Sequence, residues 1–299
     1  RIKTDDVLVL SHSLVSFNYN KMTVPEFSYI CIAVFFEAIV NRLRKHNFRC
    51  HLINCSDYTN KELKDYLHKY KPLGAIVFFA SSLELTSALP WLIDDGIPVI
   101  SIGSSSAIPP EVITLSFDNI HMGTIAAEHL IQTGHKNIAC LACQNSLDWA
   151  DTRMNAFVSY CRQRSVNPRI FKMQGDVSGY VGADSWLKMG YCLYEQVMDR
   201  FPEATAVFCI NDLVAQGFIE SAEKNKVSVP QYISVIGCGD DSLLFGHNVT
   251  TVSLEAYRIG IAAVDFLLKL AVEGASDITS AVINVNPCII NHDVSVAPP

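Results

Sequence analysis

The amino-acid sequence predicts an α/β fold made of two doubly wound lobes, each built on a parallel sheet. Short apolar runs alternate with segments of helical spacing along most of the 299 residues, a rhythm that is typical of βα units. The runs are apolar throughout rather than alternating, as expected for parallel strands that are covered on both faces. The order repeats in two half-chains of about five strands each, which indicates two lobes with a cleft between them.

The first half-chain begins with an expected strand at 7–10 and a helix whose apolar face is Ile32, Phe35, Phe36, Ile39 and Leu43. Apolar residues three or four positions apart form one stripe along a helix. Basic residues close this helix, and they suit the negative end of the helix dipole. Further strands are expected at 50–54, 74–80, 98–102 and 112–116, with helices at 60–70 and 83–94.

The second half-chain opens with a helix that Asp118 can cap and Gly134 closes. Asp118 and Asn119 are interpreted as capping residues rather than as ligand contacts. Strands are expected at 137–142, 169–173, 204–210, 233–237, 249–253 and 281–285, and helices at 151–164, 180–200, 213–225 and 256–272.

Composition excludes several classes of protein. The chain is 49% apolar and 18% charged, which is ordinary for a globular protein. Its net charge is −7 and it contains no run of basic residues, so this polypeptide itself is not expected to bind nucleic acid. No apolar run reaches the roughly 18 residues that a membrane-spanning helix needs.

The ten cysteines are scattered and lie mostly inside apolar runs. Free cysteine behaves as a small buried hydrophobe, and thiols in core strands are typical of a cytoplasmic protein. Cys140 and Cys143 form a CxxC pattern, but they lie along a strand end and no second pair accompanies them. The pattern therefore favours neither a zinc site nor a redox site, and no cofactor or metal is expected.

The most informative local feature is Asn211-Asp212, at the point where an apolar run (206–210) gives way to helical spacing. Ligands of open α/β sheets sit outside the carboxyl ends of the strands, which is where these two residues fall. Asn211 is expected to cap the helix, and Asp212 is expected to offer a carboxylate to hydroxyl or ring N–H groups. The alternative is that both residues only cap the helix.

Five segments occur together in an order that resembles the LacI/GalR family of transcriptional regulators. They are FDNIHMG (117–123), AAEHLIQTGHKNIA (126–139), NDLVAQG (211–217), VPQYISVIG (229–237), and VTTV (249–252) followed by Gly260 and AVDFLL (263–268). The resemblance covers about residues 5 to 295. It implies a type I periplasmic-binding-protein fold, with two doubly wound lobes joined by three crossovers and a small effector bound in the cleft. The expected lobes are residues 1–116 plus 239–276, and residues 117–238 plus 277–299.

Members of that family carry a DNA-binding helix-turn-helix and a hinge helix ahead of this domain. The stretch Arg1–Thr4 resembles the segment that follows the hinge helix. The resemblance thus implies the regulatory part of such a regulator, a cytoplasmic homodimer that meets DNA only through a headpiece outside this chain. The 83–92 region is the expected dimer contact.

The resemblance also implies the site residues. Asp212 matches the family's effector-binding aspartate, and Arg153 matches its arginine, with Ala156 replacing the usual glycine that follows. Trp149 is expected to stack on a sugar or a base, or to wedge under a loop. The turn after the 233–237 strand leaves open whether Asp240 or Asp241 faces the cleft. The remaining candidates, on the N-terminal lobe, are Ser11, Ser13, Phe79 and Ser81.

Two other functions compete with a regulator that senses a sugar, a sugar phosphate or a purine. A stand-alone solute-binding protein for sugar transport shares the fold, but export disfavours so many free thiols. An α/β enzyme is disfavoured because the sequence contains no nucleophile-elbow, phosphate-loop or dinucleotide motif and no metal-ligand spacing.

Overall fold

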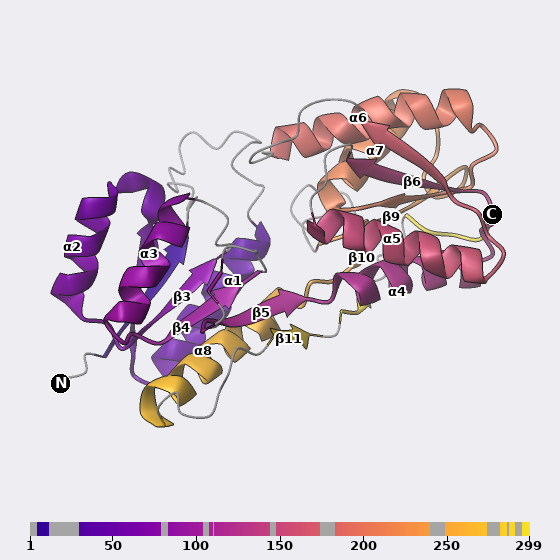
Figure 1. Ribbon diagram of the computed structural model, residues 1–299. Coiled ribbons are helices and arrows are strands. Elements are labelled where there is room, and N and C mark those ends of the chain that lie inside the picture. The colour runs from indigo at the N-terminus through magenta and orange to yellow at the C-terminus, as the bar shows by residue number, and fades with distance from the viewer. Residues whose placement is uncertain are drawn as a thin grey trace. The chain divides into compact units, whose positions relative to one another are not determined.

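The computed structural model describes residues 5–11, 30–78, 83–103, 108–109, 111–143, 148–173, 183–239, 249–273, 282–285, 287–290 and 295–299. The chain divides into two compact units, each of which alternates strands and helices (Figure 1). Unit 1 holds the first strand, Ile32–Phe117 and Glu255–Val285, and unit 2 holds Asp118–Leu254 and Asn286–Pro299. The chain therefore passes between the units after Phe117, after Leu254 and after Val285.

Unit 1 is built on a six-stranded sheet in the order β11-β5-β4-β3-β1-β2, and every neighbouring pair is parallel. Its strands are β1 (Asp6–Ser11), β2 (Arg49–Asn54), β3 (Gly74–Phe78), β4 (Val99–Ile102), β5 (Ile113–Phe117) and β11 (Val282–Val285). All five residues of β3 are buried, as expected for a strand covered on both faces.

Four α-helices cover the unit 1 sheet: α1 (Ile30–Lys45), α2 (Asn60–Tyr70), α3 (Leu83–Asp94) and α8 (Ala256–Glu273). Gly260 of α8 lies against Phe35 and Ala38 of α1, so these two helices pack against each other on one face of the sheet. Leu63 and Leu67 of α2 pack in one apolar cluster with Leu89 and Leu92 of α3. A capping box of Thr59 and Glu62 starts α2.

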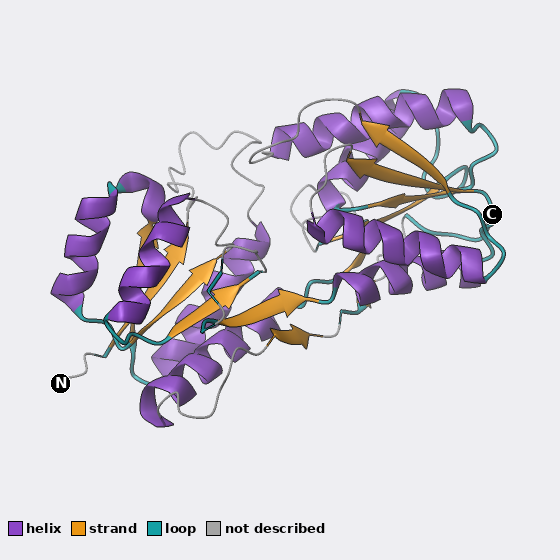
Figure 2. Ribbon diagram, in the orientation of Figure 1, coloured by secondary structure: helices purple, strands orange, loops and turns teal. Residues whose placement is uncertain are grey.

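Unit 2 repeats the arrangement, with strands between two layers of helices (Figure 2). Its sheet has the order β12-β10-β9-β8-β6-β7, and only β12 runs antiparallel to its neighbour. The strands are β6 (Ile138–Cys143), β7 (Arg169–Met173), β8 (Ala206–Cys209), β9 (Ser234–Cys238), β10 (Thr250–Val252) and β12 (Ile289–Ile290). Its helices are α4 (Asn119–Gln132), α5 (Asp148–Gln163), α6 (Ala183–Arg200) and α7 (Asp212–Lys224).

Close helix pairs form the two layers of unit 2. A Cβ on Gly123 of α4 would come within 2.1 Å of the Arg153 carbonyl oxygen of α5, so only glycine allows this approach. Gly190 of α6 and Gly217 of α7 meet in the same way. The Phe157 ring of α5 stacks on the Phe208 ring of β8 at 4.1 Å, which places α5 against the sheet.

The observed pairing corrects the lobe boundaries that the sequence predicts. β10 lies in the second sheet, whereas residues 239–276 are expected in the first lobe, and β11 lies in the first sheet, whereas residues 277–299 are expected in the second. Helix α5 begins at Asp148 rather than at Asp151, and the short strand β12 is not predicted at all. In the part of the chain that the structure describes, no helix is long and apolar enough to cross a membrane.

An ion cluster ties the ends of β1 and β2 together. Asp6 is 7% exposed and accepts hydrogen bonds from Arg49 at 2.7 and 3.1 Å. His51 Nε2 lies 2.9 Å from the same carboxylate. The Arg49 guanidinium, helped by His51, lowers the Asp6 pKa from 3.8 to about 2 against the opposing effect of burial.

Replacing Asp6 with asparagine should lower the free energy of unfolding by about 1–2 kcal/mol at pH 7, a range reduced because Arg49 is largely exposed. The folded-state pKa lies below the unfolded one, so the carboxylate stabilises the fold above about pH 4 and stops doing so as the pH falls towards 2. In urea unfolding, the gap between wild type and Asp6→Asn should therefore be full above about pH 4 and close as the pH falls towards 2. Asp65→Asn, an exposed change on α2, is the control, and a gap that is as wide at pH 2 as at pH 7 would contradict the cluster's role.

Candidate functional site

At the carboxyl edge of the unit 2 sheet, the strand β8 leads directly into the helix α7. Asn211 is the N-cap of α7, with extended backbone (φ −147°, ψ 169°), and its side chain accepts a hydrogen bond from the Val214 N–H at 2.8 Å. This satisfies one of the unpaired donors of the first helical turn. Asn211 thus fixes the angle at which α7 leaves the sheet and sets the position of Asp212.

Asp212 is completely buried and points over the neighbouring strand β9. Its Oδ1 accepts a hydrogen bond from the Thr251 hydroxyl of β10 at 2.6 Å. A Cβ on Gly237 of β9 would lie 2.2 Å from the same oxygen, so the carboxylate occupies the space that a side chain would take. The absence of a side chain at residue 237 is therefore what admits a carboxylate between α7 and the sheet.

Arg153 of α5 is 4% exposed and joins three elements. Its Nη1 donates to the Ile210 carbonyl oxygen at the end of β8, and its Nη2 donates to Asn119 Oδ1 of α4 at 2.8 Å. Its Nε donor has no hydrogen-bond partner within the described residues. A buried guanidinium donor without an acceptor is costly, and this makes the position a candidate for meeting a ligand acceptor.

Arg153 stays charged although its surroundings lower its pKa. Burial lowers the pKa of Arg153, whereas the neighbouring Cys238 thiol and the Asp212 carboxylate raise it. A guanidinium titrates so far above neutrality that it remains protonated at physiological pH. The site therefore holds one buried cation and one buried anion at the same edge of the sheet.

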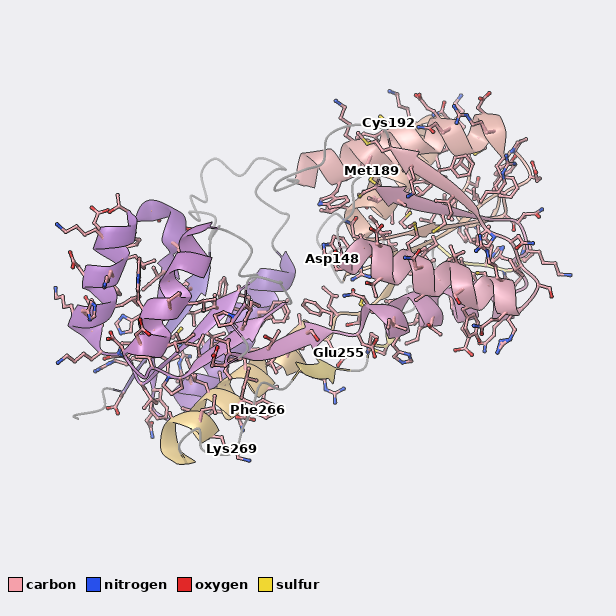
Figure 3. All side chains as sticks on the ribbon, in the orientation of Figure 1. Asp148, Met189, Cys192, Glu255, Phe266 and Lys269 are labelled. Atoms are coloured by element: carbon pink, nitrogen blue, oxygen red, sulfur yellow. The ribbon has the colours of Figure 1, made fainter. Side chains whose placement is uncertain are left out.

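An aromatic pair flanks the guanidinium. The Arg153 Cζ lies 5.0 Å from the centroid of the Trp149 ring, one helical turn earlier on α5. Trp186 of α6 packs edge-on against Trp149, with centroids 6.0 Å apart. Figure 3 labels Asp148 at the start of α5, next to Trp149 in sequence. The indole face thus holds the guanidinium by a cation–π contact, a use of Trp149 that stacking on a ligand alone does not predict.

Several partners at this edge are not predicted as site residues. Asp118 caps α4 as expected, since its carboxylate accepts from the His121 N–H at 2.8 Å, but Asn119 binds Arg153 rather than capping the helix. Thr251 and Trp186 are missed because neither carries a local signal. Thr251 reads as an ordinary strand residue, and Trp186 reads as part of an apolar helix face.

Six candidates fall where the structure gives no side-chain description. Ser11 ends β1, but its side chain is outside the described part. Ser13, Phe79, Ser81, Asp240 and Asp241 lie outside the described residues altogether. Of the site residues that the sequence predicts, the structure therefore gathers Asp212, Arg153, Trp149 and Asn211 at one edge of one sheet.

Burial and spacing characterise the thiols and the possible metal ligands of the described residues. Within the described residues, no group of three histidine, cysteine or acidic side chains is arranged to hold a metal ion. Burial raises the pKa of Cys143 to about 11 and that of Cys161 to about 12, and it raises the pKa of Cys209 as well. These thiols stay protonated near neutrality, and a protonated thiol is neither a good nucleophile nor a metal ligand.

Each unit is doubly wound, the chain crosses between the units three times, and polar groups lie at the carboxyl edge of one sheet. These features define an α/β protein of the type I periplasmic-binding-protein architecture. The comparison with protein families supports this assignment of the fold. The chain belongs to the periplasmic binding protein-like domain family, which it matches over residues 127–292.

Individual relatives and solved structures show which proteins of this fold the chain is similar to. The HTH-type transcriptional repressor PurR of Actinobacillus pleuropneumoniae is 25% identical over 256 residues, which are 79% of this chain and 70% of PurR. The repressor CytR of Escherichia coli is 26% identical over 200 residues, 66% of this chain and 54% of CytR. A LacI family transcriptional regulator from Enterococcus faecium, solved with bound ribose, has a TM-score of 0.72 at 19% identity and covers 98% of this chain and 99% of its own. The resemblance to LacI-type regulators is thereby confirmed.

The contact between Asp212 and Gly237 yields a test of the site's geometry. Gly237→Ala should destabilise the protein by about 1–3 kcal/mol, because the added methyl group overlaps the buried carboxylate. In an Asp212→Ala background the same change should cost at least about 1 kcal/mol less, since the overlapping oxygen is gone. Chemical unfolding of the four proteins of this double-mutant cycle measures the difference, and equal costs in both backgrounds would show that Asp212 does not lie over residue 237.

Proposed function

We propose that this chain is the ligand-sensing regulatory domain of a LacI/GalR-type repressor, and that it binds a sugar or sugar derivative at the carboxyl edge of the unit 2 sheet. The observation that carries the proposal is the buried Arg153, whose Nε has no hydrogen-bond acceptor among the described residues and which shares its sheet edge with the buried Asp212. The relatives PurR and CytR are transcriptional repressors, and a structural neighbour holds ribose. A stand-alone transport protein is not favoured, because these relatives are regulators.

The chemistry of the edge suits a polyhydroxylated ligand. A carboxylate accepts hydrogen bonds from hydroxyl groups, and a guanidinium donates to hydroxyl oxygens in a fixed plane. An indole offers an apolar face to the C–H side of a sugar ring. Asp212, Arg153 and Trp149 supply one group of each kind, with Asn211 beside them at the end of β8. A sugar phosphate or a purine would use the same donors and acceptors.

The further roles follow the same proposal. A homodimer in the cytoplasm would meet DNA through a headpiece outside this chain, and the domain itself would carry out no catalysis. Ligand would act by binding one arrangement of the two units more tightly than another, which shifts the population between them. The free energy by which the ligand shifts this population cannot exceed the difference between its binding free energies for the two arrangements. Coupling to DNA therefore depends on ligand contacts that are made in only one arrangement.

A thermal-shift screen against ribose, other monosaccharides, sugar phosphates and nucleobases identifies the effector. A true effector at about 100 times its dissociation constant should stabilise the wild type by roughly 2.7 kcal/mol. Asp212→Asn keeps the shape of the side chain but removes its charge, and it should abolish most of that stabilisation. Arg44→Gln, an exposed change on α1 of unit 1, should leave it intact. Full stabilisation of the Asp212→Asn protein by the same effector would remove the proposed site.

Intrinsic fluorescence gives an independent readout, because Trp149 lies against Arg153, Trp186 packs on Trp149, and the third tryptophan, Trp91, belongs to unit 1. Effector titration should change the emission of the wild type and of Trp91→Phe. Trp149→Phe should lose most of the change. A signal that disappears with Trp91 rather than with Trp149 would place the ligand elsewhere.

A further inference from the structure

A hollow that does not include Arg153 lies in unit 2 between the strand β7 and the helix α6. Its volume is about 600 Å³, and it is lined by all five residues of β7 together with Cys192, Gln196 and Arg200 of α6. Figure 3 labels Cys192, which lies on α6 one turn after Met189. The three lining residues of α6 are spaced four apart, so they form one stripe along that helix.

The hollow runs along the open edge of the sheet. Successive side chains of a strand point to opposite faces, so a space that touches all five residues of β7 must also pass along the backbone between them. The strand order ends at β7, which pairs only with β6 among the described strands. An edge strand without a second neighbour presents N–H and C=O groups that can pair with an added strand.

The lining is basic in a chain whose net charge is −7. Arg169, Lys172 and Arg200 all line the hollow, and no lining residue is acidic. Arg169 stacks on Phe201 at 4.7 Å and reaches Glu203 only at 3.8 Å, with both charged side chains about half exposed. No ion pair involves Lys172 or Arg200 within the described residues. The lining of the hollow therefore carries three cations and no anion.

Size and polarity restrict what could lie there. Five residues of β7 span about 13 Å, and the stripe from Cys192 to Arg200 spans about 12 Å. That length matches an extended segment of about five residues. Ile170, which is 42% exposed, adds an apolar contact between the cations. A second copy of β7 would bring its own Arg169 and Lys172 against these, which like-charge repulsion disfavours.

From the open strand edge and its cations, we propose that the β7–α6 hollow is a docking site for an extended acidic segment of a partner protein, which adds to the sheet as a strand beside β7. Backbone hydrogen bonds to β7 would hold the segment, and its carboxylates would meet Arg169, Lys172 and Arg200. The site is independent of the effector site, so it holds whether or not the effector is a sugar.

The test uses a fluorescein-labelled seven-residue peptide of alternating glutamate and valine. Its binding to the whole chain is measured by fluorescence polarisation at low salt. Binding should weaken as salt rises. Lys172→Gln together with Arg200→Gln should weaken it about two- to twenty-fold, since exposed charge pairs contribute little individually. The control is Lys136→Gln together with Arg162→Gln, an equal loss of charge at exposed positions of unit 2 that do not line the hollow.

Two further measurements separate strand addition from simple charge attraction. N-methylation removes the N–H donors of either the valines or the glutamates, which lie on opposite edges of an extended peptide. Only the edge that faces β7 forms hydrogen bonds with it, so one analogue should lose about tenfold in affinity and the other should bind like the parent peptide. Hydrogen exchange at the β7 amides should slow when the parent peptide is bound.

Three outcomes overturn the proposal. The first is no saturable binding, which would mean that the cations only protect the edge against aggregation. The second is equal binding of both methylated analogues, and the third is full competition by glutarate at equal charge. Either of these last two would identify a site for small anions instead.

Discussion

The buried guanidinium of Arg153 is the constraint on which the site in unit 2 depends. Removing a cation from water is expensive unless acceptors replace the lost solvation. Here the acceptors come from the end of β8 and from Asn119 of α4, while Trp149 covers the planar face. Moving any of these elements would strand a buried charge, so the guanidinium fixes α4, α5 and β8 relative to one another at the edge where Asp212 is held.

Close packing supplies the second half of that arrangement. The α4–α5 pair can support the guanidinium only because Gly123 lets the helices touch at the Arg153 backbone. Asp212 can lie over β9 only because Gly237 leaves room, and Thr251 then holds its oxygen. Both glycines are thus explained by close contacts of other residues rather than by unusual backbone angles. Opposite charges are brought to one edge by packing, and the polar contacts then fix their orientation.

The sequence suffices to predict the alternation of strands and helices, because buried parallel strands are apolar throughout and their helices carry one apolar stripe. It also suffices for Asn211, whose capping role follows from its place between a strand and a helix. It fails where pairing is non-local. The residues 249–252 and 282–285 carry no local pattern that indicates which sheet they join, so the lobe boundaries predicted from the sequence place β10 and β11 in the wrong lobes. Asn119, Thr251 and Trp186 contribute through contacts made across the fold, and such contacts leave no local pattern.

The two edge strands show how the same position acquires different properties. β2 and β7 each occupy one end of a six-stranded sheet, and each begins with an arginine. In unit 1, Asp6 neutralises Arg49 through paired hydrogen bonds at 2.7 and 3.1 Å, and the lowered pKa of Asp6 keeps that carboxylate charged. In unit 2, the ion pair that Arg169 makes among the described residues is a longer one, to Glu203 at 3.8 Å with both side chains about half exposed, and Lys172 and Arg200 add to its charge. Because an unpaired strand edge binds any compatible strand, its charge decides which partners are admitted. The positive edge of β7 thus repels a copy of itself while remaining open to an acidic strand.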